Sequence, residues 1–175
     1  PDNLSVENQA QINWATSLAV LKTLGKFGLI AKIKWPNDVL VNETKICGIL
    51  IENQVSGNFL STSFIGIGLN INQQNFFDFS ATSIRNETGN TFLIREILDA
   101  LILEMNHYFL LLNSSNLELK KEYLCSLYRF IEKSFFEAEN QVFEGTIIDV
   151  SSAGLLVIEK NGKPFEFGLK TIKYC

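Results

Sequence analysis

The sequence predicts an α+β fold followed by a small β-barrel. Three observations lead to this prediction. Residues 7–28 have helical hydrophobic spacing, several apolar segments of strand length follow them, and two further helical patterns come after those segments. From about Phe135 onward the pattern changes to short strands separated by turns. With 175 residues and 46% hydrophobic content, the chain can bury one sizeable core and form a small satellite domain beside it.

The first half of the chain reads as one helix and then strands. The helical pattern of residues 7–28 ends near two glycines, which are common stop signals. Residues 29–35 alternate apolar and basic side chains as a half-buried strand does, and this strand should end at Pro36, because the residue before a proline avoids the helical region. Residues 39–41 and 45–54 then predict a hairpin whose second strand is central in the sheet.

The second half adds one more strand, two helices and the barrel. Residues 61–72 form a third apolar segment of strand type, and helices are expected over residues 90–112 and 116–130. In the final segment, Asn161–Gly162 separates two alternating strands, and this dipeptide is a strong hairpin signal because both residues tolerate positive φ. The function of a barrel of about 40 residues cannot be read from its own side chains.

Charge and composition argue against several classes of function. A net charge of −4 gives no basic field for nucleic acid or for anionic lipid. No apolar run approaches the roughly 18 residues of a membrane helix, so no membrane partner is expected. Cys47, Cys125 and Cys175 lack metal-site spacing, and His107 stands in no recognisable catalytic triad. We therefore expect a cytoplasmic protein with reduced thiols and no tightly bound cofactor.

The segment IGIGLNIN, residues 65–72, is the most informative strand. Its apolar side chains point to one face, while Gly66, Gly68, Asn70 and Asn72 point to the other. Glycine inside a strand costs about 0.5–1 kcal/mol relative to alanine, so two glycines on one face need a reason. Either a ligand approaches the backbone closely or a helix packs across the sheet. Both explanations stay open, and a further glycine in the neighbouring strand favours a shared floor for a flat ligand.

Opposite charges are expected to meet at one end of this floor. Lys45 opens the strand that contains Gly48, and it follows Asp38 by seven residues across a short hairpin. An ammonium group there could stabilise developing negative charge, and the carboxylate could help to hold a divalent cation. The alternative is an ordinary surface salt bridge, and the spacing alone does not separate the two.

The motif KWPND at residues 34–38, the lysine of KICGIL and the segment IGIGLN together closely resemble the biotin protein ligases. The resemblance implies a mixed β-sheet with flanking helices, related to class II aminoacyl-tRNA synthetases, followed by a small SH3-like β-barrel. It assigns residues 1–133 to the C-terminal part of the catalytic domain and residues 134–175 to the SH3-like domain.

The resemblance also implies a two-step reaction with biotin as substrate and with ATP and Mg²⁺ as co-substrate. Biotin and ATP would give biotinyl-5'-AMP, and a lysine of a biotin carboxyl carrier protein domain would then attack it. Lys45 would contact the biotin carboxylate and the α-phosphate, and Asp38 would orient the attacking lysine or the metal and polar network. The remaining implied contacts are Gly48, Gly66 and Gly68 for biotin, and Asn37 and Asn70 for the nucleotide; no metal ligands are assigned.

The sequence lacks two segments that family members carry, and this bears on its expected activity. Family members carry a Ser/Thr-containing biotin-contacting segment and a Gly/Arg-rich loop of the GRGRxGR type, upstream of the region where this sequence starts, and neither is present here. We therefore expect a fragment of a longer ligase with little activity alone, rather than a natural shortened homologue. Association with the missing part, or with a second copy as a homodimer, would cover apolar surface left exposed.

Two other functions stay open at this point. A lipoate ligase or another acyl-adenylate ligase could use the same fold, and the choice between biotin and lipoate would distinguish it. A non-catalytic module that binds a biotin carrier domain belongs to another class, and carrier binding without ATP turnover would support it.

Overall fold

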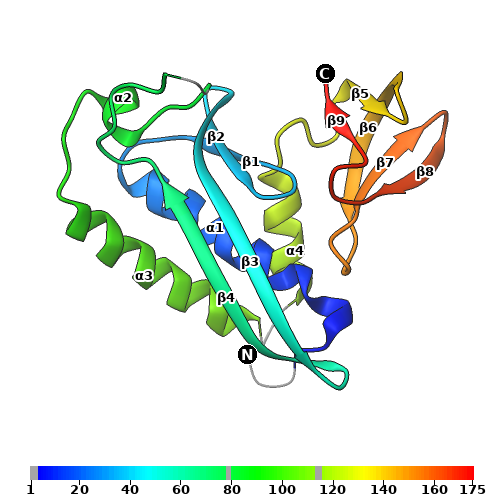
Figure 1. Ribbon diagram of the computed structural model, residues 1–175, viewed down its shortest axis with the longest axis horizontal. Helices are drawn as coiled ribbons and strands as arrows, with labels where there is room; N and C mark the ends of the chain where they lie inside the picture. The colour runs from blue at the N-terminus through cyan, green and yellow to red at the C-terminus, as the bar shows by residue number, and fades with distance from the viewer. Residues whose placement is uncertain (1–3, 78–79, 113–115) are drawn as a thin grey trace.

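The computed structural model describes residues 4–77, 80–112 and 116–175 (Figure 1). Its helices are η1 (a 3-10 turn, Val6–Asn8), α1 (Ala10–Lys26), α2 (Ile84–Thr88), α3 (Ile94–Leu111) and α4 (Asn116–Cys125). Its strands are β1 (Ala31–Lys34), β2 (Asp38–Val41), β3 (Thr44–Ser56), β4 (Phe59–Leu69), β5 (Lys133–Ala138), β6 (Gln141–Val150), β7 (Leu156–Lys160), β8 (Lys163–Phe167) and β9 (Lys173–Tyr174). The α+β class is confirmed.

The first sheet is built from β1 to β4. In the described part of the chain it has four strands in sequence order, and each neighbouring pair is antiparallel. Isolated parallel bridges also join Ile33 to Leu127 and Lys45 to Ala81, outside the four-strand ladders. The turn between β2 and β3 is made by Asn42 and Glu43, both with positive φ, as tight hairpins require.

Helix α1 is buried around most of its circumference, because it lies between the first sheet, α3 and α4. Figure 1 shows α1 and α3 on the same side of β3 and β4, with the other face of these strands turned toward the viewer. The hydroxyl groups of Thr16 and Thr23 are buried inside this layer. They donate to the carbonyl oxygens of Ile12 and Ala19, at 2.7 and 2.8 Å, so neither is left without a partner.

Two predicted elements differ from the structure. The helix expected over residues 116–130 is wrong in its second part, because α4 ends at Cys125. The chain leaves the helix there to pair with β1: Ile33 donates to the carbonyl of Ser126, and Tyr128 donates back to the carbonyl of Ile33. The stretch between β4 and α3, over which the sequence predicted no helix, contains the short helix α2, whose first turn is capped by the Ser83 hydroxyl.

The second sheet is the small β-unit expected at the end of the chain. Within the residues described, it has five antiparallel strands in the order β8-β7-β6-β5-β9. The hairpin expected at Asn161–Gly162 is present between β7 and β8, and both residues have positive φ.

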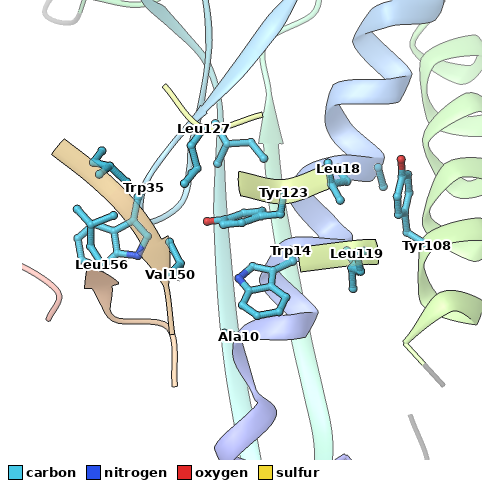
Figure 2. Packing of buried hydrophobic residues seen from close by; sticks show 14 of the residues in the cluster. Ala10, Trp14, Leu18, Trp35, Tyr108, Leu119, Tyr123, Leu127, Val150 and Leu156 are labelled. Carbon is cyan, nitrogen blue, oxygen red and sulfur yellow. The ribbon is translucent and has the colours of Figure 1, made fainter. Parts of the chain in front are cut away.

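One hydrophobic core joins the two sheets. The same cluster of buried residues contains Trp14 and Leu18 of α1, Trp35 after β1, and Ile147 and Leu156 of the second sheet. Figure 2 shows Trp35 beside Val150 and Leu156, on the side of the core away from Tyr108. The second unit is therefore fixed against the first by shared apolar packing. None of the helices in the described ranges is long and apolar enough to cross a bilayer.

Candidate functional site

A β-bulge places the charged pair above the glycines. Asp38 lies opposite Gly48 in the β2–β3 ladder, but the register then shifts by one residue, so that Leu40 lies opposite Lys45. Ile46 and Cys47 are consecutive residues and both are buried, as the extra residue of a bulge allows. Lys45 and Gly48 would face opposite sides of a regular strand because they are three residues apart. The bulge brings them to the same side.

Lys45 and Asp38 form an ion pair at this end of the sheet. The Lys45 Nζ lies 2.6 Å from Asp38 Oδ1, and the two side chains are 46% and 29% exposed. A Cβ atom built on Gly48 would lie 3.2 Å from Lys45 Nζ and 3.7 Å from Asp38 Oδ1. Any larger residue at position 48 would therefore push against the ion pair. The structure brings these three predicted residues together.

The glycines form an open floor that continues from the ion pair. Gly48 pairs with Gly68, and Leu50 pairs with Gly66. A Cβ atom on Gly66 or Gly68 would meet only atoms of the neighbouring strand, at 3.6 Å or more, among the described residues. No described helix packs across these glycines, so that explanation of them fails. The floor has room for a ligand.

Asn37 and Asn70, the two predicted nucleotide contacts, form hydrogen bonds to backbone groups in this structure. Asn37 makes two bonds to Ile49: its side-chain amide donates to the Ile49 carbonyl, and its own carbonyl accepts from the Ile49 amide, each at 2.8 Å. Asn70 donates from its side chain to the carbonyl of Thr82 at 3.0 Å. Both side chains retain an amide oxygen for a further partner, and contact with a nucleotide stays a prediction.

Residues Ala81 and Thr82 belong to this site although the sequence pattern gave no signal for them. Ala81 bridges to Lys45, and the Thr82 amide donates to the Lys45 carbonyl at 2.8 Å. The Thr82 hydroxyl in turn donates to Glu87 at 2.6 Å. The backbone of Lys45 is therefore held from both sides, by β2 and by this returning segment.

Cys47 lies beneath the ion pair and is not a nucleophile. Burial raises the pKa of its thiol to about 12, with opposing smaller effects from the Lys45 and Asp38 charges. The thiol is therefore protonated near neutral pH. His107 is exposed on α3 and belongs to neither the ion pair nor the glycine floor.

Comparison with known proteins shows what part of this chain is similar to. Residues 5–70 match the biotin/lipoate A/B protein ligase family. The chain is 38% identical over 101 residues to the biotin–[acetyl-CoA-carboxylase] ligase of Paracoccus denitrificans, a match that covers 53% of the chain and 42% of the relative. It is 37% identical over 75 residues to the bifunctional ligase/repressor BirA of Bacillus subtilis, covering 42% of the chain and 23% of the relative. The chain thus matches less than half the length of these relatives.

Solved structures confirm the fold of the chain. The biotin protein ligase of Aquifex aeolicus superposes with a TM-score of 0.77 at 24% identity, covering 97% of this chain and 76% of that one. The same enzyme solved with biotin and ATP gives a TM-score of 0.76 at 23% identity, covering 96% of this chain and 73% of that one. The fold that the resemblance implied is therefore confirmed.

Proposed function

We propose that this chain supplies the acid-activating half of a biotin protein ligase. The observation that carries the proposal is the Lys45–Asp38 pair, 2.6 Å apart, at the end of an exposed floor that contains Gly48, Gly66 and Gly68. A flat, apolar ring system can lie on bare backbone, while its carboxylate reaches the ammonium group. The relative from Paracoccus denitrificans, which is named as a biotin–[acetyl-CoA-carboxylase] ligase, supports biotin as the acid.

The reaction proceeds in two displacements. A carboxylate oxygen of biotin attacks the α-phosphorus of ATP, the bond from that phosphorus to the bridging oxygen breaks, and pyrophosphate leaves. The amine of a carrier-domain lysine then attacks the acyl carbon, loses a proton and releases AMP. Lys45 would neutralise the charge that builds between the carboxylate and the phosphate, and Asp38 would hold Lys45 and the incoming amine in position.

Magnesium would enter with the nucleotide. In the ranges that the structure describes, no group of three His, Cys, Asp or Glu side chains could hold a metal ion. Proteins commonly bind Mg²⁺ through one or two carboxylates together with substrate phosphates and water. Asp38 is the carboxylate available at the floor, and it would supply one oxygen. A need for ATP and Mg²⁺ agrees with the cytoplasmic location expected from the sequence.

The test is exchange of labelled pyrophosphate into ATP. It is run on this chain, and on the chain together with any native upstream coding sequence, with biotin, with lipoate and with neither acid. Exchange that depends on biotin supports the proposal. Exchange with lipoate alone would replace biotin by lipoate as the substrate, and carrier binding with no exchange in either protein would contradict the ligase function.

A further inference from the structure

Residues Trp35, Pro36 and Asn37, directly before Asp38, are held by three different elements. The indole nitrogen of Trp35 donates to the carbonyl of Gly154 at 3.0 Å, in the second sheet's unit. The side chain of Asn13, in α1, donates to the carbonyl of Pro36 at 2.8 Å. Asn37 is bonded to β3 as described above. Each residue of the segment therefore has its own anchor, and Asp38 follows the last of them.

The Gly154 anchor comes from a tight turn between β6 and β7. The Gly154 amide donates to the carbonyl of Ser151 at 2.8 Å, and the Ser151 hydroxyl accepts from the Leu155 amide at 3.1 Å. Gly154 has a φ of +91°, which side chains disfavour, and a Cβ atom there would already touch Ala10 of α1 at 3.6 Å. The position of this carbonyl is thus fixed by the turn, which also accepts a hydrogen bond at its Ser152 carbonyl from the Ala10 amide of α1, at 3.4 Å.

Trp35 connects this turn to the charged pair. Its ring is 5% exposed and packs in the shared core beside Val150 and Leu156 (Figure 2). A buried indole N–H needs an acceptor, and the Gly154 carbonyl provides it. Movement of the turn would therefore reach Asp38 through the two intervening residues.

We propose that Trp35 is a positioning residue for the Lys45–Asp38 pair, and that the turn at residues 151–154 sets its position from the second sheet. This inference rests on the proposed function, because it assigns the anchored segment a role in that reaction. The residue would act through Asp38 and not on the substrate itself. Its role is to hold the Asp38 carboxylate above Gly48, where small displacements lower the rate without removing the binding surface.

The first test is the variant Trp35→Phe, which keeps an aromatic ring and removes the N–H donor. We expect kcat of biotin-dependent pyrophosphate exchange to fall by about 10- to 100-fold, with KM for biotin and ATP nearly unchanged. The matched control is Trp14→Phe. Trp14 is buried in the same core cluster, and its indole donates no hydrogen bond to a described residue, so this control should retain kcat. Equal kcat in the two variants would overturn the proposal.

A second readout needs no substrate, so it separates failure of this inference from failure of the ligase function. The Ile49 amide donates to the carbonyl of Asn37, and its hydrogen exchange reports whether the segment is held. We expect exchange at Ile49 to be faster in Trp35→Phe than in Trp14→Phe, while the amides of α1 exchange alike. Unchanged exchange at Ile49 would overturn the proposal even in an active enzyme.

A second variant reaches the same bond from the other side. Gly154→Ala alters the turn and leaves the Lys45–Asp38 pair and the glycine floor unchanged in sequence. It should reproduce both the kcat loss and the faster hydrogen exchange at Ile49. If Trp35→Phe and Gly154→Ala both fail to fold, the contact serves folding alone and the positioning role is refuted.

Discussion

The segment from Trp35 to Asp38 has a buried side and an open side, and the two differ in chemistry. On the buried side, Trp35 packs with Trp14 and Leu156 in a core shared by both sheets. On the open side, Asp38 and Lys45 stand partly exposed beside glycines that nothing in the described chain covers. Packing on the buried side determines where this segment lies. The open side is therefore free to receive a ligand.

The largest expected effect is on stability, and it tests the difference in burial directly. Leu18→Ala on α1 removes a side chain that is 0% exposed, and should lower the free energy of unfolding by about 2–5 kcal/mol. Leu50→Ala on the floor removes a side chain that is 62% exposed, and should change it by less than about 0.5 kcal/mol. Urea unfolding curves measure both. Similar losses in the two variants would mean that the floor is packed rather than open.

Two glycine variants test the same difference between the packed core and the open floor, with smaller expected effects on stability. A Cβ atom on Gly145 of β6 would lie 2.6 Å from Ile158 Cγ2, so Gly145→Ala should destabilise the protein by about 1–3 kcal/mol. Gly68→Ala meets only an ordinary contact at 3.6 Å, and should leave stability unchanged or raise it slightly. Thermal unfolding compares the two.

The floor position should instead show its effect in binding. Gly68→Val projects a branched side chain over the floor, and should weaken biotin binding before it lowers the unfolding temperature. Isothermal titration calorimetry measures the affinity. Undiminished affinity in Gly68→Val would place the biotin site elsewhere.

Some of these features could be predicted from the sequence and others could not. The alternation of IGIGLNIN and the hairpin between Asp38 and Lys45 follow from local pattern, so the strands and the exposed glycine face could be predicted. The bulge at Ile46 could not be, because it depends on how β2 and β3 pair rather than on either strand alone. Without the bulge, Lys45 and Gly48 would be expected on opposite faces.

The contacts that cross between units were also outside sequence reasoning. The bond from Trp35 to Gly154 joins residues 119 positions apart. The early end of α4 at Cys125 has the same origin, because pairing with β1 outweighs the helical pattern that continues beyond it. Long-range packing decides both features, and a local pattern carries no information about it.

The smallest effect concerns the thiols. Cys125 and Cys175 are exposed, whereas Cys47 is buried beneath the ion pair with its pKa raised to about 12. At pH 8 the buried Cys47 thiol would therefore be protonated. A colorimetric thiol reagent should therefore modify two cysteines quickly in the folded protein and the third only on unfolding. Three fast thiols would show that the sheet opens readily beneath the ion pair.

The most direct test of the account is the biotin-dependent pyrophosphate exchange rate of Lys45→Ala. The account predicts a fall on the order of 100- to 1000-fold with an unfolding midpoint close to that of the parent, because the side chain is partly exposed and acts on developing charge. Lys163→Ala, at an exposed lysine of β8, is the matched control and should retain the parent rate. A near-normal exchange rate in Lys45→Ala would contradict the central claim that this ion pair carries the chemistry.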